Sequence, residues 1–214
     1  MNRFREDPLS LLSRLANRVN TAWLKATYPF PEFGQNVSVH FSCELTRSCA
    51  NYIRVQDDVF VGPDVWMNVM FRLDETDPKI VLGRGACIGR RSMISAKNYI
   101  EIGDDVLFAP AVLLMDHNHE YADPTAPIHA QGTTEGGRII VGKNCWLGYG
   151  CVIVCAKGEL IVGENSIIGA NSVVTRSIPP RSIVAGNPAK VIRAYDAGSK
   201  TWRRVAEIGN SVTR

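Results

Sequence analysis

Long hydrophobic runs and a strong excess of charge are both missing from this chain. No stretch approaches the roughly 18 consecutive apolar residues of a membrane-spanning helix. The N-terminus carries Arg3, Arg5, Glu6 and Asp7 where a secretion signal needs an apolar segment. A net charge of +3 falls well short of the dense basic surface of nucleic-acid-binding domains. We therefore expect a cytoplasmic protein that binds no nucleic acid and whose ligand is a small charged molecule.

The six cysteines lack the spacing of a metal or disulfide framework. No C-x2-C pair occurs, so the usual thiolate ligands of a structural zinc site are missing. The chain has 214 residues, which is long for a domain that depends on disulfides, and it has no secretory features. We expect buried structural thiols and no bound metal.

A repeat of six residues is the clearest pattern that is present. Apolar side chains recur at this step in the following series: Val37, Cys43, Cys49, Val55, Val61, Met67; Leu82, Ile88, Ile94; Ile102, Phe108, Leu114; Val141, Leu147, Ile153; Val162, Ile168, Val174. A second small or apolar residue stands four positions later, as Ala86 follows Leu82. This period is neither that of a helix nor the alternation of a strand. The hexads come in threes, which predicts triangular coils of short strands stacked as a parallel β-helix.

Interruptions of the repeat define the expected segments. Residues 1–36 form an N-terminal helical or capping segment, residues 37–184 the β-helix, and residues 185–214 a C-terminal arm. A long excursion loop spans residues 116–138. Within the first segment, apolar residues at helical spacing follow Pro8 and stop before Pro29, which predicts an amphipathic helix. That helix either caps the open end of the coil or, with Arg14, Arg18 and Lys25, allows peripheral membrane association.

The excursion begins with residues suited to acid–base chemistry. Asp116, His117, Asn118, His119 and Glu120 stand together where the chain leaves the rigid scaffold. A histidine can remove a proton from a hydroxyl near neutral pH, and a carboxylate beside it can orient the ring.

Three stretches carry a resemblance to a known family: Asn118-His119-Glu120-Tyr121, Cys145-Trp146-Leu147-Gly148, and Ala185-Gly186-Asn187-Pro188-Ala189-Lys190. With the hexads, they resemble the hexapeptide-repeat acyltransferases, in the branch of maltose, galactoside, colanic-acid and lipopolysaccharide O-acetyltransferases. The resemblance covers about residues 55–193. It implies an all-β fold, a left-handed parallel β-helix, and a homotrimer with sites between subunits. It further implies transfer of acetyl from acetyl-CoA to a sugar or polysaccharide hydroxyl, by direct attack on the thioester.

The same resemblance assigns roles to individual residues. An ungapped count from Ile102 places the catalytic base on His119, with His117 as the second candidate and Asp116 or Glu120 as the orienting carboxylate. The residues expected to bind CoA are Trp146, Gly148, Tyr149, Ala170, Thr175, Arg176, Lys190 and Arg193. The basic ones among them would meet the phosphates of CoA.

Three other functions stay open at this point. A zinc enzyme like the γ-class carbonic anhydrases shares the coil architecture and would draw its ligands from His40, His117, His119 and His129. A non-catalytic scaffold would use the coils only as a surface. A xenobiotic acetyltransferase would differ in the acceptor alone, and the sequence does not identify the acceptor.

Overall fold

The computed structural model describes residues 8–70 and 76–204, and parallel β-strands dominate it. The strands form three sheets, each assembled from segments that are far apart in the sequence. Sheet A contains β1 (Glu32–Phe33), β3 (Ile53–Val55), β6 (Ile80–Leu82), β9 (Tyr99–Ile102), β12 (Gly136–Val141) and β15 (Lys157–Val162). Sheet B begins with β2 (Ser38–Val39), β4 (Phe60–Val61), β7 (Cys87–Ile88), β10 (Leu107–Phe108), β13 (Trp146–Leu147), β16 (Ile167–Ile168) and β18 (Ser182–Ala185). Sheet C contains β5 (Trp66–Val69), β8 (Met93–Ala96), β11 (Leu113–Met115), β14 (Val152–Val154) and β17 (Val173–Val174).

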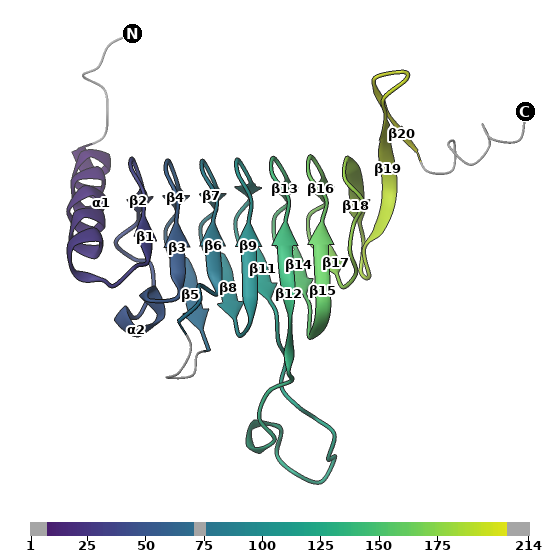
Figure 1. The fold of residues 1–214 in the computed structure, drawn as a ribbon. Coiled ribbons are helices and arrows are strands. Elements are labelled where there is room, and N and C mark those ends of the chain that lie inside the picture. The colour runs from purple at the N-terminus through teal and green to yellow at the C-terminus, as the bar shows by residue number, and fades with distance from the viewer. Residues whose placement is uncertain (1–7, 71–75, 205–214) are drawn as a thin grey trace, which may run out of the picture.

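The chain visits the three sheets in turn and so winds into a three-sided stack (Figure 1). Within the stack, strands of successive coils pair in parallel in each sheet. In sheet A, Leu82 is paired with Ile102, Ile102 with Val141, and Val141 with Val162. These are the first residues of successive hexads, so the predicted stacking of hexads into parallel coils is confirmed.

The interior of the stack is filled by the two inward positions of each hexad. Leu82, Ile88 and Ile94 at the first position are fully buried, as are Ala86 and Ser92 at the second. Such burial of short side chains along the whole axis provides the hydrophobic stabilisation of the fold. All six cysteines are free thiols, and four of them are buried (Cys49, Cys145, Cys151 and Cys155).

The first coil departs from the expected register. It begins at β1, ahead of residue 37. Phe33 pairs with Val55 where the step of six pointed to Val37, and Val39 pairs with Val61 where it pointed to Cys43. A short helix, α2 (Arg47–Ala50), then places Cys49 outside the strands. The side chain of Thr46 caps α2 by accepting the N–H of Cys49. The residues added by α2 break the step of six at this point.

Different structures cover the two ends of the stack. Helix α1 (Pro8–Thr27) confirms the expected N-terminal helix and lies against β2. At the other end, β19 (Lys190–Asp196) and β20 (Thr201–Arg204) add antiparallel strands to β18. The C-terminal arm expected from residue 185 therefore contains two strands joined by turns as far as Arg204, and residues 205–214 lie outside the described part. No helix within residues 8–70 and 76–204 has the length and apolar character needed to cross a membrane.

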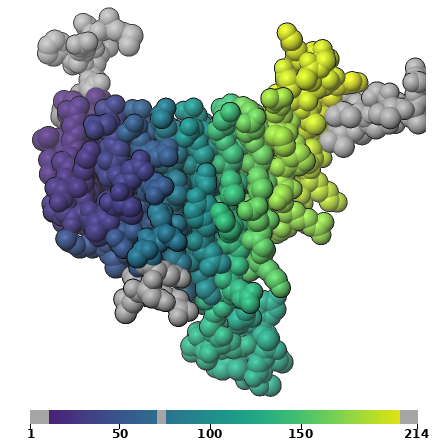
Figure 2. All heavy atoms as spheres, in the orientation of Figure 1, coloured from purple at the N-terminus to yellow at the C-terminus, as the bar shows by residue number. Residues whose placement is uncertain are grey.

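The excursion loop leaves the stack after β11 and returns at β12. It contains one turn of 3-10 helix, η1 (Ile128–Ala130), and stands clear of the packed body of the molecule (Figures 1 and 2). Because β11 belongs to sheet C and β12 to sheet A, the root of the loop marks the edge where these two sheets meet.

Candidate active site

Asp116 occupies the edge between sheets C and A, directly after β11. Its carboxylate is fully buried and accepts the backbone N–H groups of Lys97 (2.7 Å), Asn98 (2.8 Å) and Tyr99 (2.8 Å). These donors belong to the turn of the preceding coil, between β8 and β9. Three N–H donors suit an ionised carboxylate, so Asp116 is a fixed negative group that joins two coils.

His117 contacts this carboxylate through one ring nitrogen. Its Nδ1 lies 2.9 Å from Oδ1 of Asp116, and its side chain is almost fully buried. An ionised carboxylate can only accept, so Nδ1 donates to it and, in the neutral ring, Nε2 carries the lone pair. The arrangement fixes the tautomer and leaves Nε2 as the nitrogen that can take a proton from a substrate.

His119 lies further along the excursion and is exposed. It forms an isolated antiparallel bridge with Thr133, which closes the root of the loop. Next to the bridge, the N–H of Thr134 donates to the carbonyl of Asn118 at 2.8 Å. The Nζ of Lys97 donates to Oγ1 of Thr133 at 3.1 Å. The root of the loop is therefore tied to the coil, and both candidate histidines come from anchored backbone.

A cavity of about 470 Å³ shares two residues with the backbone segment that holds Asp116. Its lining consists of Arg54, Asp77, Pro78, Val81, Asn98, Tyr99 and Arg138. Asn98 and Tyr99 are the residues whose N–H groups hold Asp116, so the cavity and the pair share a turn. The Arg138 guanidinium lies 4.7 Å from the centre of the Tyr99 ring. Sequence reasoning missed this cavity, because its residues come from four coils and no motif connects them.

Burial and a hydrogen bond to Glu101 keep Tyr99 in its neutral form. The Tyr99 hydroxyl donates to Oε2 of Glu101 at 2.7 Å. Together with desolvation, this contact raises the pKa of Tyr99 to about 12. The phenol therefore stays a neutral hydrogen-bonding group throughout the physiological range of pH.

The first three residues expected to bind CoA lie in β13 (Trp146) and directly after it (Gly148 and Tyr149). Trp146 and Tyr149 are exposed by 50% and 56%. The stacking of coils requires glycine at position 148. A Cβ there would lie 2.6 Å from the carbonyl oxygen of Ile168 and 2.7 Å from the amide nitrogen of Ala170 in the next coil. The glycine thus has a packing reason that is independent of any ligand.

Trp146 also lines a second cavity, of about 430 Å³, on the outside of sheet B. The cavity is bounded by Asn144, Trp146, Asn165, Ile167, Arg181, Tyr195 and Trp202. Tyr195 and Trp202 come from β19 and β20, and their rings meet edge to face at 5.5 Å. No sequence signal connected these aromatic residues with Trp146, because antiparallel pairing of β19 with β18 brings them there.

The remaining expected CoA residues are all exposed: Ala170, Thr175, Arg176, Lys190 and Arg193. Thr175 and Arg176 follow β17 at the edge between sheets C and A, where His117 also lies two coils away. Gly148, Tyr149 and Ala170 lie at the edge between sheets B and C, and Lys190 and Arg193 lie on β19. Within one chain, Thr175 and Arg176 therefore share an edge with His117, whereas the other expected CoA residues lie on sheet B, at the edge between sheets B and C, or on β19.

The described residues contain no group of three or more His, Cys, Asp or Glu side chains arranged to hold a metal ion. Of the four histidines named for a zinc site, His40 contacts Oγ of Ser42 at 2.8 Å in the first coil. His129 lies in η1 at the far part of the excursion. These two are separated in the chain fold from the Asp116–His117 pair.

Comparison with known proteins places the chain among acetyltransferases. A lipopolysaccharide biosynthesis O-acetyl transferase, WbbJ of Escherichia coli, is 30% identical over 176 residues, which are 76% of this chain and 85% of WbbJ. The galactoside O-acetyltransferase of the same organism is 39% identical over 107 residues, 48% of each chain. No family model matches the chain.

Solved structures show the same fold. A galactoside acetyltransferase in complex with coenzyme A is 25% identical, with a TM-score of 0.56 over 92% of this chain and 87% of that one. AntD, an N-acyltransferase from Bacillus cereus, gives a TM-score of 0.67 at 18% identity, over 89% of this chain and 94% of AntD. At that identity the likeness to AntD concerns the fold alone.

The similarity to WbbJ extends over most of both proteins. It sets aside the zinc-enzyme and scaffold interpretations, because those functions belong to other families. The chain belongs to the hexapeptide-repeat acyltransferases, in their sugar O-acetyltransferase branch, and is an acyltransferase.

Proposed function

We propose that this protein transfers an acetyl group from acetyl-CoA to a hydroxyl of a sugar, or of a polysaccharide or lipopolysaccharide precursor. The names of WbbJ and of the galactoside O-acetyltransferase support the acceptor class, and the coenzyme A complex of the galactoside enzyme supports the donor. The observation that carries the chemistry is the Asp116–His117 pair, with one imidazole nitrogen held by a buried carboxylate.

In the proposed reaction a histidine removes the proton of the acceptor hydroxyl. The hydroxyl oxygen forms a bond to the thioester carbonyl carbon, the carbon–sulfur bond breaks, and the leaving thiolate of CoA takes the proton back from the imidazolium. The geometry favours His117 as this base, because Asp116 fixes its ring and stabilises the positive charge that forms. His119, which the sequence count favours, stays the second candidate.

The cavity beside Tyr99 is the proposed seat of the acceptor. Its walls offer carboxylate, amide and guanidinium groups of Asp77, Asn98 and Arg138 together with an aromatic ring. Sugar hydroxyls need such donors and acceptors, and the apolar face of a sugar ring packs on an aromatic side chain. The cavity shares Asn98 and Tyr99 with the backbone that holds Asp116, which connects the proposed acceptor site to the residue that orients the proposed base.

The proposed CoA site combines surfaces of two chains in a homotrimer of left-handed β-helices. The exposed indole of Trp146 offers an apolar contact for pantetheine or adenine, and Arg176, Lys190 and Arg193 offer exposed cations for phosphates. The expected residues lie on different edges of one chain, so a neighbouring subunit would be needed to complete the site. The exposed side chain of Tyr121, in the projecting excursion, is available for contact with that neighbour.

The proposal includes a cytoplasmic location. Its support is the state of the thiols, because all six cysteines are free, as in proteins of a reducing compartment. Cell fractionation of the native protein would test it.

Alanine substitution of each histidine tests the proposed chemistry. With saturating acetyl-CoA, simple galactosides and glucosides as acceptors, and CoA release as the readout, we expect His117→Ala to lower kcat by about 10²–10⁴-fold. His119→Ala should have a smaller effect, and the control His129→Ala should be close to the native enzyme. Asp116→Asn should also lower kcat, because the amide can donate to Nδ1 and so favour the wrong tautomer.

Calorimetric binding of acetyl-CoA to each variant separates loss of chemistry from loss of folding. Unchanged binding with lost turnover supports the proposal. A larger loss in His119→Ala would move the base to His119. Failure of the native protein to bind acetyl-CoA would contradict the proposed donor.

A further inference from the structure

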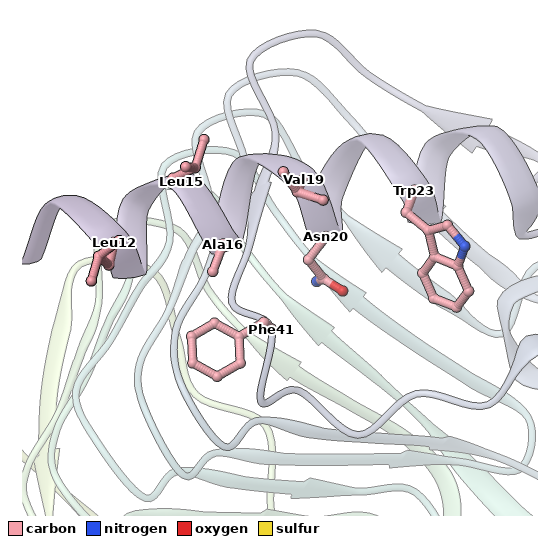
Figure 3. Close-up of a pocket in the computed structure, with 7 residues that line it drawn as sticks. All are labelled: Leu12, Leu15, Ala16, Val19, Asn20, Trp23 and Phe41. Carbon is pink, nitrogen blue, oxygen red and sulfur yellow. The ribbon is translucent and has the colours of Figure 1, made fainter. Parts of the chain in front are cut away.

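Helix α1 turns its apolar stripe away from the coil. Leu12, Leu15, Val19 and Trp23 are exposed by 63%, 59%, 62% and 52%, although they recur at the spacing of one helix face. Phe41, which follows β2, is 53% exposed and lies beside this stripe. These five side chains, with Ala16 and Asn20, line an open groove of about 610 Å³. Figure 3 shows the seven residues on α1 and after β2.

The opposite, polar face of α1 contacts the coil. Oγ1 of Thr21 accepts the N–H of Val39 at 3.0 Å, and Nδ2 of Asn20 donates to the carbonyl of Val39 at 3.2 Å. Oδ1 of Asn17 accepts the N–H of Phe41 at 3.2 Å. β2 is the edge strand of sheet B, so its outward N–H and C=O groups need partners. The helix supplies them, and this requirement is what turns the apolar stripe outward.

The charge of α1 is entirely positive. Its 20 residues contain Arg14, Arg18 and Lys25 and no Asp or Glu. At 3.6 residues per turn, these three positions fall together on one flank of the apolar stripe. Arg14 and Arg18 are exposed, and Lys25 donates its Nζ to the carbonyl of Gly34 at the rim of the first coil.

We propose that the apolar stripe of α1, with Phe41, is a docking surface for an anionic lipid membrane. A helix that lies in a membrane interface combines an apolar stripe of Leu and Trp with Lys or Arg beside it, and here both are held in place by the hydrogen bonds to Val39 and Phe41. The cations would meet lipid headgroups while Leu12, Leu15, Val19 and Trp23 enter the acyl boundary. This inference does not depend on the proposed acetyl transfer.

A second copy of the chain is a poorer occupant than lipid. The same helix from another copy would bring an apolar stripe, but it would bring cations against cations and no carboxylate, since α1 contains no Asp or Glu. An anionic membrane offers acyl chains to the apolar stripe and negative headgroups to the cations. This charge complementarity favours lipid as the occupant.

Vesicle co-sedimentation of the full-length protein tests the proposal. We expect pelleting with vesicles of equimolar phosphatidylglycerol and phosphatidylcholine, and much less with pure phosphatidylcholine. Leu15→Gln combined with Val19→Gln should weaken binding by about tenfold or more, because two apolar anchors are lost. Arg18→Gln should weaken it by about fivefold, as expected for one cation near an anionic surface. The matched control, Ile161→Thr with Ile192→Thr, removes two exposed apolar side chains elsewhere and should bind like the native protein.

Three results would overturn the proposal. One is the absence of pelleting with the anionic vesicles, and another is equal loss in the control and in the α1 variant. The third is self-association in light scattering that disappears in Leu15→Gln/Val19→Gln without any vesicle binding, which would make a second copy the occupant. Circular dichroism and acetyl-CoA binding of each variant verify that the protein remains folded and able to bind its donor.

Discussion

Buried thiols take the place of small apolar side chains inside the stack. Cys151 is fully buried, and its burial raises the pKa of the thiol from its ordinary value of 9.0 to about 12. Desolvation likewise raises the pKa of Cys145, and that of Cys43 to about 11. The cause in each case is that the interior disfavours the charged thiolate. These groups are therefore neutral packing elements with little thiolate at physiological pH.

The raised pKa of Cys151 predicts a loss of stability in alkaline solution. In the unfolded chain the thiol ionises from about pH 9, whereas in the folded chain it holds its proton until about pH 12. The stabilising contribution is thus complete below pH 9 and disappears between these values. We expect the free energy of unfolding of the native protein to fall at least about 1 kcal/mol more steeply over this range than that of Cys151→Ala. Urea unfolding at several pH values measures this, and parallel curves for the two proteins would refute it.

The inward residues of most coils could be predicted because the hexad repeat places Leu82 and Ala86 at fixed intervals. The prediction failed in the first coil. Val37 and Val39 are equally suited to a strand interior, and the residues of α2 displace a count of six made backwards from Val55. The contact of Asp116 with His117 could not be predicted from the sequence either. Adjacent residues of a strand point to opposite faces, and these two meet only because the strand ends at Met115. The structure of the backbone at the edge between sheets C and A was therefore needed to decide which carboxylate orients which imidazole.

At the scale of elements, α1 stabilises the first coil mainly by hydrogen bonds to the backbone of the coil. It contributes little apolar burial. Leu24 is its one side chain in the hydrophobic core among those described. The N–H of Val39 has the hydroxyl of Thr21 as its partner, and this hydroxyl also donates to the carbonyl of Asn17 at 2.7 Å. An edge strand that keeps such groups satisfied offers no template for another chain.

Thr21→Val should loosen α1 from the coil. The substitution keeps the shape but leaves the N–H of Val39 without its acceptor, which costs about 1–3 kcal/mol for a buried donor. Amide hydrogen exchange should therefore become faster at Val39 and along α1. Thr27→Val is the matched control, because the hydroxyl of Thr27 contacts only the carbonyl of Trp23 within the same helix. Equal exchange in the two variants would show that Thr21 does not hold the helix.

At the scale of the whole molecule, the prism separates groups that the proposed reaction needs together. Trp146 lies on the outer side of sheet B, whereas His117 lies where sheets C and A meet. Coils stacked on their neighbours are rigid along the axis, so no bending of one chain can join these edges. Subunits placed side by side can join them, which is the reason for the proposed homotrimer.

Two measurements test the shared site. Light scattering should give a mass three times the 23.6 kDa of the chain. Co-expressed His117→Ala and Trp146→Ala chains should regain part of the activity that each lacks alone, because a mixed assembly contains interfaces with one intact histidine and one intact tryptophan. A monomer mass, or mixed assemblies as inactive as their parents, would contradict a site built from two chains.

The regular stacking of coils also fixes the distance between α1 and the proposed base. In sheet A, β1 is followed by β3, β6 and β9, and the coil of β9 is the one that ends at the Asp116–His117 pair. Neighbouring strands lie about 4.8 Å apart, so about 14 Å along the axis separate the coil that supports α1 from the coil that supports the proposed base. Adding or removing one coil between them would change this height by a single strand spacing without altering either end. If α1 rests on a membrane, the number of hexads thus sets how far above the lipid an acceptor hydroxyl must stand to be acetylated.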